Sequence, residues 1–219
     1  MKKLLILSLF VPFNVFCQCT YKDLLPFKNN ISRFEAINIS NNIDRFIPDS
    51  ERNWSPGSFS NIEYLKNDSV YKDSYYLNVN SLKCFTFDSC YYTLNFCDDK
   101  LYKQTIILYF KPSSYKKCIT TYETLIAIFK NAFTITRNKQ NIYNSDNNVQ
   151  IGECYNFSNY DFKKLYPKLN ESSVGYSLVY KSFYNSSQNK TILTNEIEYY
   201  EIEIQSVDLT KVKLTAEGY

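Results

Sequence analysis

The chain has 219 residues, 25 basic and 22 acidic side chains, a net charge of +3 and no histidine. The near-neutral charge argues against nucleic acid or an anionic membrane as partner. The lack of imidazole excludes Ser–His–Asp and Cys–His catalysis and histidine metal sites, and four glycines supply no phosphate-binding loop.

The first 17 residues are typical of a secretory signal. Two lysines precede an apolar run of about 13 residues, which is too short to span a membrane. Val15 and Cys17 suit the −3 and −1 positions of a signal peptidase site, so we expect an exported, periplasmic or extracellular chain that begins at residue 18. Lipidation at Cys17 or Cys19 is the alternative, although neither follows the small residue of a lipobox.

Export to an oxidising compartment makes the six remaining cysteines candidates for three disulfides. Three of them crowd into residues 84–97, where two paired strands could carry a cross-strand bridge. Cys118 is expected to bond to the sheet beneath it, with a small buried thiol as the alternative. The candidates are Cys19, Cys84, Cys90, Cys97, Cys118 and Cys154.

The N-terminal half predicts one helix followed by strands. Ser32 and Glu35 have the spacing of a capping box, and the apolar stripe over residues 36–47 predicts a helix that Pro48 ends. Residues 49–61 are expected to form a surface loop. Rows of Tyr, Phe, Ile and Thr then predict an antiparallel meander with strands at residues 70–79, 83–87, 91–96 and 102–110, and turns at residues 88–89 and 98–100.

Residues 112–133 carry the strongest helix pattern in the chain. Apolar side chains recur with the i, i+3, i+4, i+7 spacing, Pro112 suits the first turn, and Ser113 or Ser114 could cap it. Because such a stripe must be buried, we expect this helix to lie on the sheet formed by the flanking strands. The stripe comprises Tyr115, Cys118, Ile119, Tyr122, Leu125, Ile126, Phe129, Ala132 and Phe133.

The C-terminal half predicts a second run of strands. We expect a β-bulge where the alternation slips between Tyr199 and Tyr200, and a loose tail over residues 211–219. The predicted segments are strands at residues 135–143 and 149–157, a helical turn at residues 160–169, and a hairpin of residues 175–184 and 196–207.

Together these segments predict an α+β fold. In it an antiparallel sheet, made of a meander and a C-terminal hairpin, packs against one long amphipathic helix, with a shorter N-terminal helix. We expect residues 18–219 to form a single exported domain, with two helix-plus-meander halves at residues 31–110 and 111–210 as the alternative. The capped helix from Ser32 and Glu35, followed by a meander, resembles small envelope proteins of the outer-membrane assembly lipoprotein type. The helix lacks the glycine usual in that family, and no function is transferred from the resemblance.

Tyrosines of the C-terminal hairpin are the predicted binding anchors. The chain has 21 Tyr and 16 Phe, and exposed tyrosine rings on a sheet suit contact with a protein or a sugar. The alternative is that this aromatic content reflects base composition and serves packing. The proposed anchors are Tyr176, Tyr180, Tyr184, Tyr199 and Tyr200.

We therefore expect an exported, non-enzymatic interaction protein with no cofactor, no metal and no catalytic residues, whose partner is another envelope or extracellular protein. A carboxylate-dependent glycan hydrolase is one alternative, with Asp98, Asp99, Glu153 and the acidic residues between 196 and 203 as its candidates. A structural envelope or matrix component is another. Eight Asn-X-Ser/Thr sequons keep a eukaryotic secreted glycoprotein as a further alternative.

Overall fold

A computed structural model of the chain describes residues 19–42, 46–49, 70–77, 79–83, 85–143, 150–158, 174–184 and 197–208, with residues 70, 134–138 and 184 described by their backbone alone. The predicted signal, nearly all of the loop after residue 49, the helical turn at residues 160–169 and the C-terminal tail lie outside these residues.

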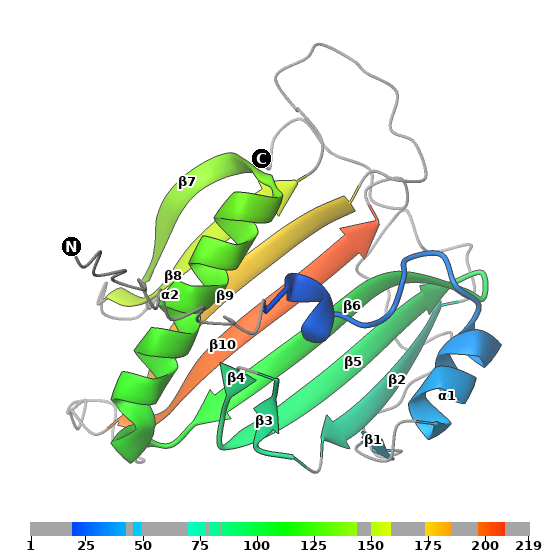
Figure 1. Ribbon diagram of the computed structural model, residues 1–219, viewed down its shortest axis with the longest axis horizontal. Helices are drawn as coiled ribbons and strands as arrows, with labels where there is room; N and C mark the ends of the chain where they lie inside the picture. The colour runs from blue at the N-terminus through cyan, green and yellow to red at the C-terminus, as the bar shows by residue number, and fades with distance from the viewer. Residues whose placement is uncertain are drawn as a thin grey trace, which may run out of the picture.

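The fold is built on an eight-stranded antiparallel sheet with strand order β1-β2-β5-β6-β10-β9-β8-β7 (Figure 1). Each half of the chain contributes four strands in sequence order. The last strands of the two halves, β6 and β10, pair in the centre and join them. The strands are β1 Phe46–Pro48, β2 Val70–Leu77, β5 Ser89–Cys97, β6 Lys100–Phe110, β7 Thr134–Tyr143, β8 Gln150–Ser158, β9 Val174–Tyr184 and β10 Ile197–Asp208.

Two helices accompany this sheet in the described residues, α1 Arg33–Asn41 and α2 Tyr115–Ala132. The expected α+β class with an antiparallel sheet is thus confirmed. None of the helices in the described part of the chain is long and apolar enough to cross a membrane.

The helix α1 begins as predicted and ends early. Ser32 and Glu35 form the capping box, but the helix stops at Asn41 instead of continuing to residue 47. The predicted extension is wrong because Phe46 belongs to β1, where its ring packs against Tyr75 and other aromatic rings at centroid distances of 5.4–5.9 Å. Burial of this ring outweighs the local helical pattern.

A bidentate ion pair ties α1 to β2. Arg33 donates to both carboxylate oxygens of Asp73 at 2.7 and 2.8 Å, and its guanidinium lies 4.8 Å from the centre of the Tyr71 ring. Such a planar, two-bond contact fixes direction as well as distance. It holds the first turn of α1 beside the outer part of the sheet (Figure 1).

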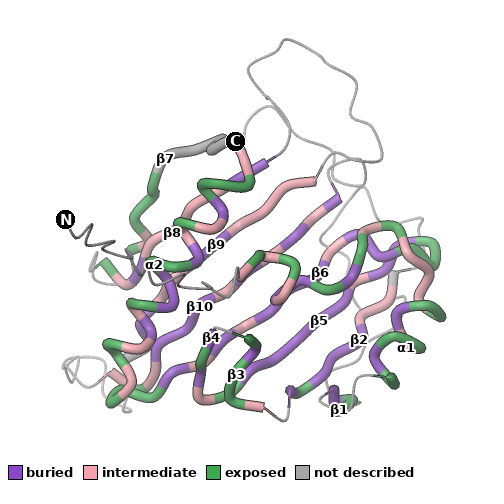
Figure 2. The backbone as a smooth tube through the Cα atoms, in the orientation of Figure 1, coloured by how far each residue is buried: buried purple, intermediate pink, exposed green. Residues whose placement is uncertain are grey.

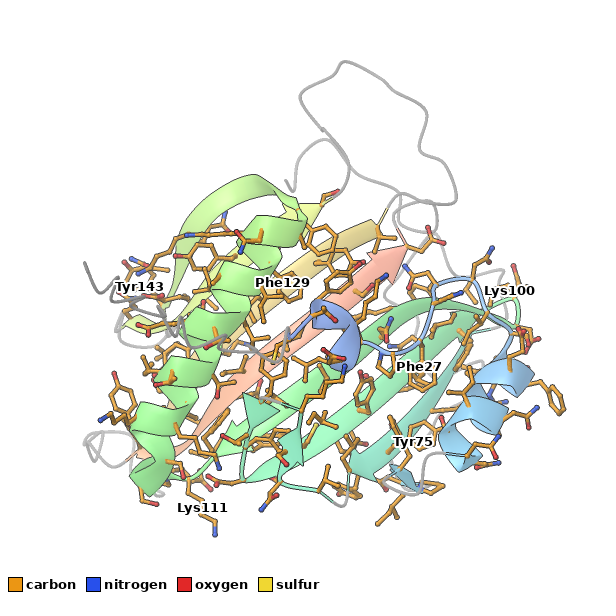
Figure 3. The ribbon with its side chains drawn as sticks, viewed as in Figure 1. Phe27, Tyr75, Lys100, Lys111, Phe129 and Tyr143 are labelled. Atoms are coloured by element: carbon orange, nitrogen blue, oxygen red, sulfur yellow. The ribbon has the colours of Figure 1, made fainter. Side chains whose placement is uncertain are left out.

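The long helix α2 crosses β8, β9 and β10 on one face of the sheet (Figure 1). Phe129 points between the helix and the strands (Figure 3), with its ring centre 5.3 Å from Phe157 and 5.8 Å from Tyr176. Tyr115 and Ala132, at the ends of the predicted stripe, are exposed. The buried residues of α2 are Cys118, Thr121, Tyr122, Leu125 and Phe129.

The helix α2 does not begin with the serine cap that we expected. Pro112 opens a 3₁₀ turn, η4 Pro112–Ser114, as predicted for a proline. In the described residues 111–115, no side chain caps the turn or the helix, so the prediction that Ser113 or Ser114 does so is wrong. The Ser114 hydroxyl bonds to Asp88 instead.

Residues 19–31, here called the N-terminal strap, contribute several side chains to the core. Its 3₁₀ turn, η1 Tyr21–Asp23, places the Tyr21 ring 4.8 Å from Phe133 and 5.5 Å from Tyr176. Further along, Leu24 is fully buried and Phe27 packs over the strands (Figure 3). Figure 2 shows buried segments running along the central strands and meeting this strap.

Three local strand predictions need correction. The strand expected at residues 83–87 is a separate small hairpin of β3 Ser81–Leu82 and β4 Phe85–Thr86, and Lys83 between them has a left-handed φ of 50°. The turn expected at residue 89 is wrong, because Ser89 begins β5. The bulge in β10 is confirmed but falls between Ile197 and Tyr199, not between the two tyrosines.

The described cysteines differ from the expected set of three bridges. Cys90, Cys97, Cys118 and Cys154 are not disulfide-bonded, whereas Cys19 is. Cys90 and Cys97 lie on the same strand, and at about 3.3 Å per residue they are ~23 Å apart, far beyond the ~7 Å that a disulfide can bridge. Cys84 lies outside the described residues.

We expect the substitution Phe129→Ala to destabilise the protein by about 3–5 kcal/mol, because it empties a fully buried ring site between α2 and the sheet. Urea unfolding followed by circular dichroism measures the loss. Phe34→Ala is the matched control, since that ring is 70% exposed on α1 and its removal should change stability by less than ~0.5 kcal/mol. Equal losses would show that Phe129 is not a core residue.

Candidate functional site

The structure separates the five predicted tyrosine anchors. Tyr176, Tyr180 and Tyr200 face α2, because alternate residues of a strand share one face. Tyr176 stacks on Phe133 with ring centres 4.3 Å apart, and Tyr180 lies 5.5 Å from Tyr122. Burial raises the pKa of Tyr176 well above the ordinary tyrosine value. These three side chains contribute to packing beneath the helix.

The other two anchors lie elsewhere. Tyr184 is the last residue of β9, and only its backbone is described. Tyr199 lies on the face of the sheet away from α2, called the outer face below, where its ring stacks on Phe183 at 4.5 Å and approaches Tyr109 at 5.7 Å. The five tyrosines therefore do not form one binding surface.

A groove that the sequence did not indicate lies between the first half of α2 and the β3–β4 hairpin. Its volume is about 560 Å³. The hairpin and the first turns of α2 stand side by side in Figure 1, in front of the sheet. Lysine and hydroxyl side chains dominate the lining, which consists of Phe85, Thr86, Ser113, Ser114, Lys116, Lys117, Thr120, Thr121 and Thr124.

The two walls of this groove are tied together at its base. Thr121 is buried on α2 and its hydroxyl donates to the backbone carbonyl of Thr86 at 3.4 Å. The Phe85 ring beside it is almost fully buried. The Thr124 hydroxyl donates its proton to the backbone carbonyl of Thr120 at 2.8 Å and keeps only lone pairs toward solvent, whereas the Thr120 hydroxyl keeps its proton. The groove thus has an apolar base and hydroxyl-bearing walls.

At the end of the groove where α2 begins, Asp88 holds three neighbouring groups by hydrogen bonds. Its carboxylate accepts the backbone N–H of Lys111 at 2.7 Å and the Lys117 ammonium at 3.1 Å, and it bonds to the Ser114 hydroxyl. Burial alone would raise the pKa of Asp88, but these three donors together lower it below its ordinary value. Asp88 therefore stays ionised at neutral pH and neutralises Lys117.

Lys116 remains as the uncompensated charge of the groove. It is exposed and forms no ion pair with any described residue. Lys116 and the hydroxyl of Thr120, which donates to no described residue, can donate hydrogen bonds to a carboxylate, phosphate or sulfate. Cys118, two residues further along α2, is no nucleophile here, because burial and the nearby Asp88 charge raise its pKa to about 12.

The carboxylates considered for hydrolysis are dispersed in the structure. Asp98 and Asp99 form the exposed β5–β6 turn with left-handed φ values of 49° and 62°. Glu153 pairs with Lys139 at the far edge of the sheet. The described residues contain no group of three or more acidic or cysteine side chains that could hold a metal ion. Glu201 and Glu203 of β10 lie two residues apart and share the outer face.

Part of the groove has a sequence signal. Serine, lysine and threonine recur along the polar side of the helix over residues 113–124, but a polar helix face is usually just solvated. The opposite wall comes from Phe85 and Thr86, whose separate hairpin was not predicted. Comparison with protein-family models, with curated proteins and with solved structures finds no match to this chain.

We expect Asp88→Ala to cost about 1–3 kcal/mol, because it removes a carboxylate bonded to a backbone N–H and an ammonium. Since the pKa of Asp88 is lowered by folding, its contribution is complete above the unfolded-state pKa and disappears as the pH falls through the folded-state pKa. Thermal unfolding at pH 7 and pH 2.5 measures this. A variant that loses as much stability at pH 2.5 as at pH 7 would contradict the role.

Proposed function

We propose that the protein is an exported, non-enzymatic interaction protein that holds an acidic segment of a partner protein in the groove between α2 and the β3–β4 hairpin. The single observation that carries the proposal is a groove of about 560 Å³ lined by two lysines and six hydroxyl side chains without a carboxylate. The predicted secretory signal supports export and a partner in the same compartment.

The chemistry of the groove favours a carboxylate-bearing segment. Its volume lies within the range of ordinary ligand sites and suits a few side chains rather than a large domain. Lys117 is already occupied by Asp88, so Lys116 would meet the partner's charge and the hydroxyl of Thr120 would donate to a remaining oxygen. An acidic peptide satisfies both requirements at once.

The same contacts support binding rather than turnover. Asp88 is held ionised by three donors, which makes it a poor proton donor. The raised pKa of Cys118 keeps its thiol protonated at neutral pH. The groove therefore supplies hydrogen-bond donors and positive charge, which are the requirements of a recognition site.

Binding of a fluorescein-labelled hexaglutamate peptide, compared with hexaglutamine, tests the proposal. We expect the acidic peptide to bind more tightly, and Lys116→Glu to weaken it about tenfold through loss of one ionic hydrogen bond. Lys28→Glu is the matched control, an exposed lysine on the N-terminal strap that does not line the groove. Fluorescence anisotropy gives the affinities.

Two results would contradict this function. One is equal binding of the two peptides by the unaltered protein. The other is an equal effect of the Lys116 and Lys28 substitutions, which would mean that net charge rather than the groove determines binding. Both variants change the net charge by the same amount, so the comparison separates position from charge.

A further inference from the structure

The N-terminal strap begins with a cysteine whose bonding partner can be inferred. Cys19 is disulfide-bonded. The described cysteines that carry no disulfide are Cys90, Cys97, Cys118 and Cys154. Cys17 and Cys84 therefore remain as partners, and both lie outside the described residues. Cys17 is the last residue of the predicted secretory signal, which we expect to be removed on export. A mature chain then retains Cys84 alone.

One carboxylate joins the chain neighbours of these two cysteines. Asp23, in the turn η1, accepts hydrogen bonds from the backbone N–H and the hydroxyl of Thr20 at 2.8 and 3.1 Å. The other oxygen of the same carboxylate pairs with the ammonium of Lys83. Thr20 directly follows Cys19, and Lys83 directly precedes Cys84. Because consecutive Cα atoms are about 3.8 Å apart, the described contacts bring the two cysteine positions to adjoining parts of the backbone.

The β3–β4 hairpin is too short to hold its position by strand pairing alone. It pairs only Ser81 with Thr86 and Leu82 with Phe85, and even a longer isolated hairpin is marginally stable in water. Further support comes from the bond between Thr121 and Thr86 and from the burial of the Phe85 ring. The turn of the hairpin, at positions 83 and 84, is where a covalent bond to the strap would restrain it most.

The strap side of this connection is accessible to small thiols. Cys19 is half-buried, and Thr20 beside it is exposed. Disulfides that a thiolate can reach are opened and closed by exchange, whereas deeply buried ones are inert. A bond at Cys19 is therefore suited to reversible cleavage in the folded protein.

We propose that Cys19 and Cys84 form a disulfide that fastens the β3–β4 hairpin to the N-terminal strap and acts as a redox latch on one wall of the groove. The bond forms by exchange with a disulfide-bonded donor of the exporting compartment. Two S–H bonds of the protein and the S–S bond of the donor break, the new S–S bond forms, and the donor leaves as two thiols that carry the two protons. Regulation of the groove rests on the proposed function, and the bond itself does not.

Disulfide mapping of the exported protein tests the bond. Thiols are blocked with iodoacetamide under denaturing, non-reducing conditions, and trypsin then cuts after Lys22, Lys83 and Lys100. We expect residues 18–22 to be cross-linked to residues 84–100, with the blocking group on Cys90 and Cys97 only. A blocked Cys84, or a bond from Cys19 to any other cysteine, would overturn the proposal.

Hydrogen exchange measures the latch without reference to any ligand. Loss of the bond in the double variant Cys19→Ser, Cys84→Ser should speed amide exchange in the hairpin about tenfold or more, because local opening is no longer restrained. The reporter is the amide of Phe87, which donates to the carbonyl of Asn80 at 3.0 Å. Cys154→Ser is the matched control, a half-buried thiol on β8 without a disulfide, and should leave this exchange unchanged.

Reduction of the unaltered protein gives the same test without a substitution. Tris(2-carboxyethyl)phosphine should speed exchange in the hairpin as the double variant does, and reoxidation with oxidised glutathione should restore the slow rate. Thermal unfolding of each sample checks that the sheet remains folded. Unchanged exchange at Phe87 in both the reduced protein and the double variant would overturn the latch.

Binding of hexaglutamate then connects the latch to the groove. We expect reduction to weaken binding about threefold, since the wall that carries Phe85 and Thr86 is less well ordered before the ligand arrives. If the oxidised protein binds hexaglutamate and reduction leaves its affinity unchanged, regulation is overturned and the groove function stands. If the oxidised protein does not bind the peptide, the groove function fails, and mapping and exchange still decide the latch.

Discussion

The antiparallel ladder between β6 and β10 is the interaction on which the rest of the structure depends. It joins two meanders of four strands and sets the register from Phe110 opposite Tyr200 to Lys103 opposite Val207. That register places Ile106 next to Ile204 under the helix side, both fully buried. A slip of one residue would turn the acidic residues of β10 into the core, so burial itself enforces the pairing.

The same ladder produces two faces of opposite character. On the helix side, Leu108 and Ile202 lie opposite each other in the core. On the outer side, the next pair along is Tyr109 and Glu201. The cationic groove therefore lies on the helix side of the sheet, and the carboxylates of Glu201 and Glu203 lie on the other side.

Local patterns predicted part of this structure and tertiary contacts decided the rest. The stripe of α2, the capping box at Ser32 and the strands of the C-terminal hairpin follow from spacing alone, because each shows its pattern within one continuous segment of the sequence. Phe46 and Tyr21 could not be placed that way, since their partners lie on other elements. Strand parity already separated Tyr199 from Tyr200, but which of them meets the helix depends on packing. The groove could not be predicted, because one of its walls is α2 and the other is the β3–β4 hairpin, which the sequence did not indicate.

The N-terminal strap has a consequence for the order in which the molecule assembles. Tyr21 is among the first described residues, and its ring partners Phe133 and Tyr176 are translated long after it. Contacts between such distant parts of a chain form late and slow the search for the native state. The beginning of the chain must therefore wait, unprotected, until the second meander exists.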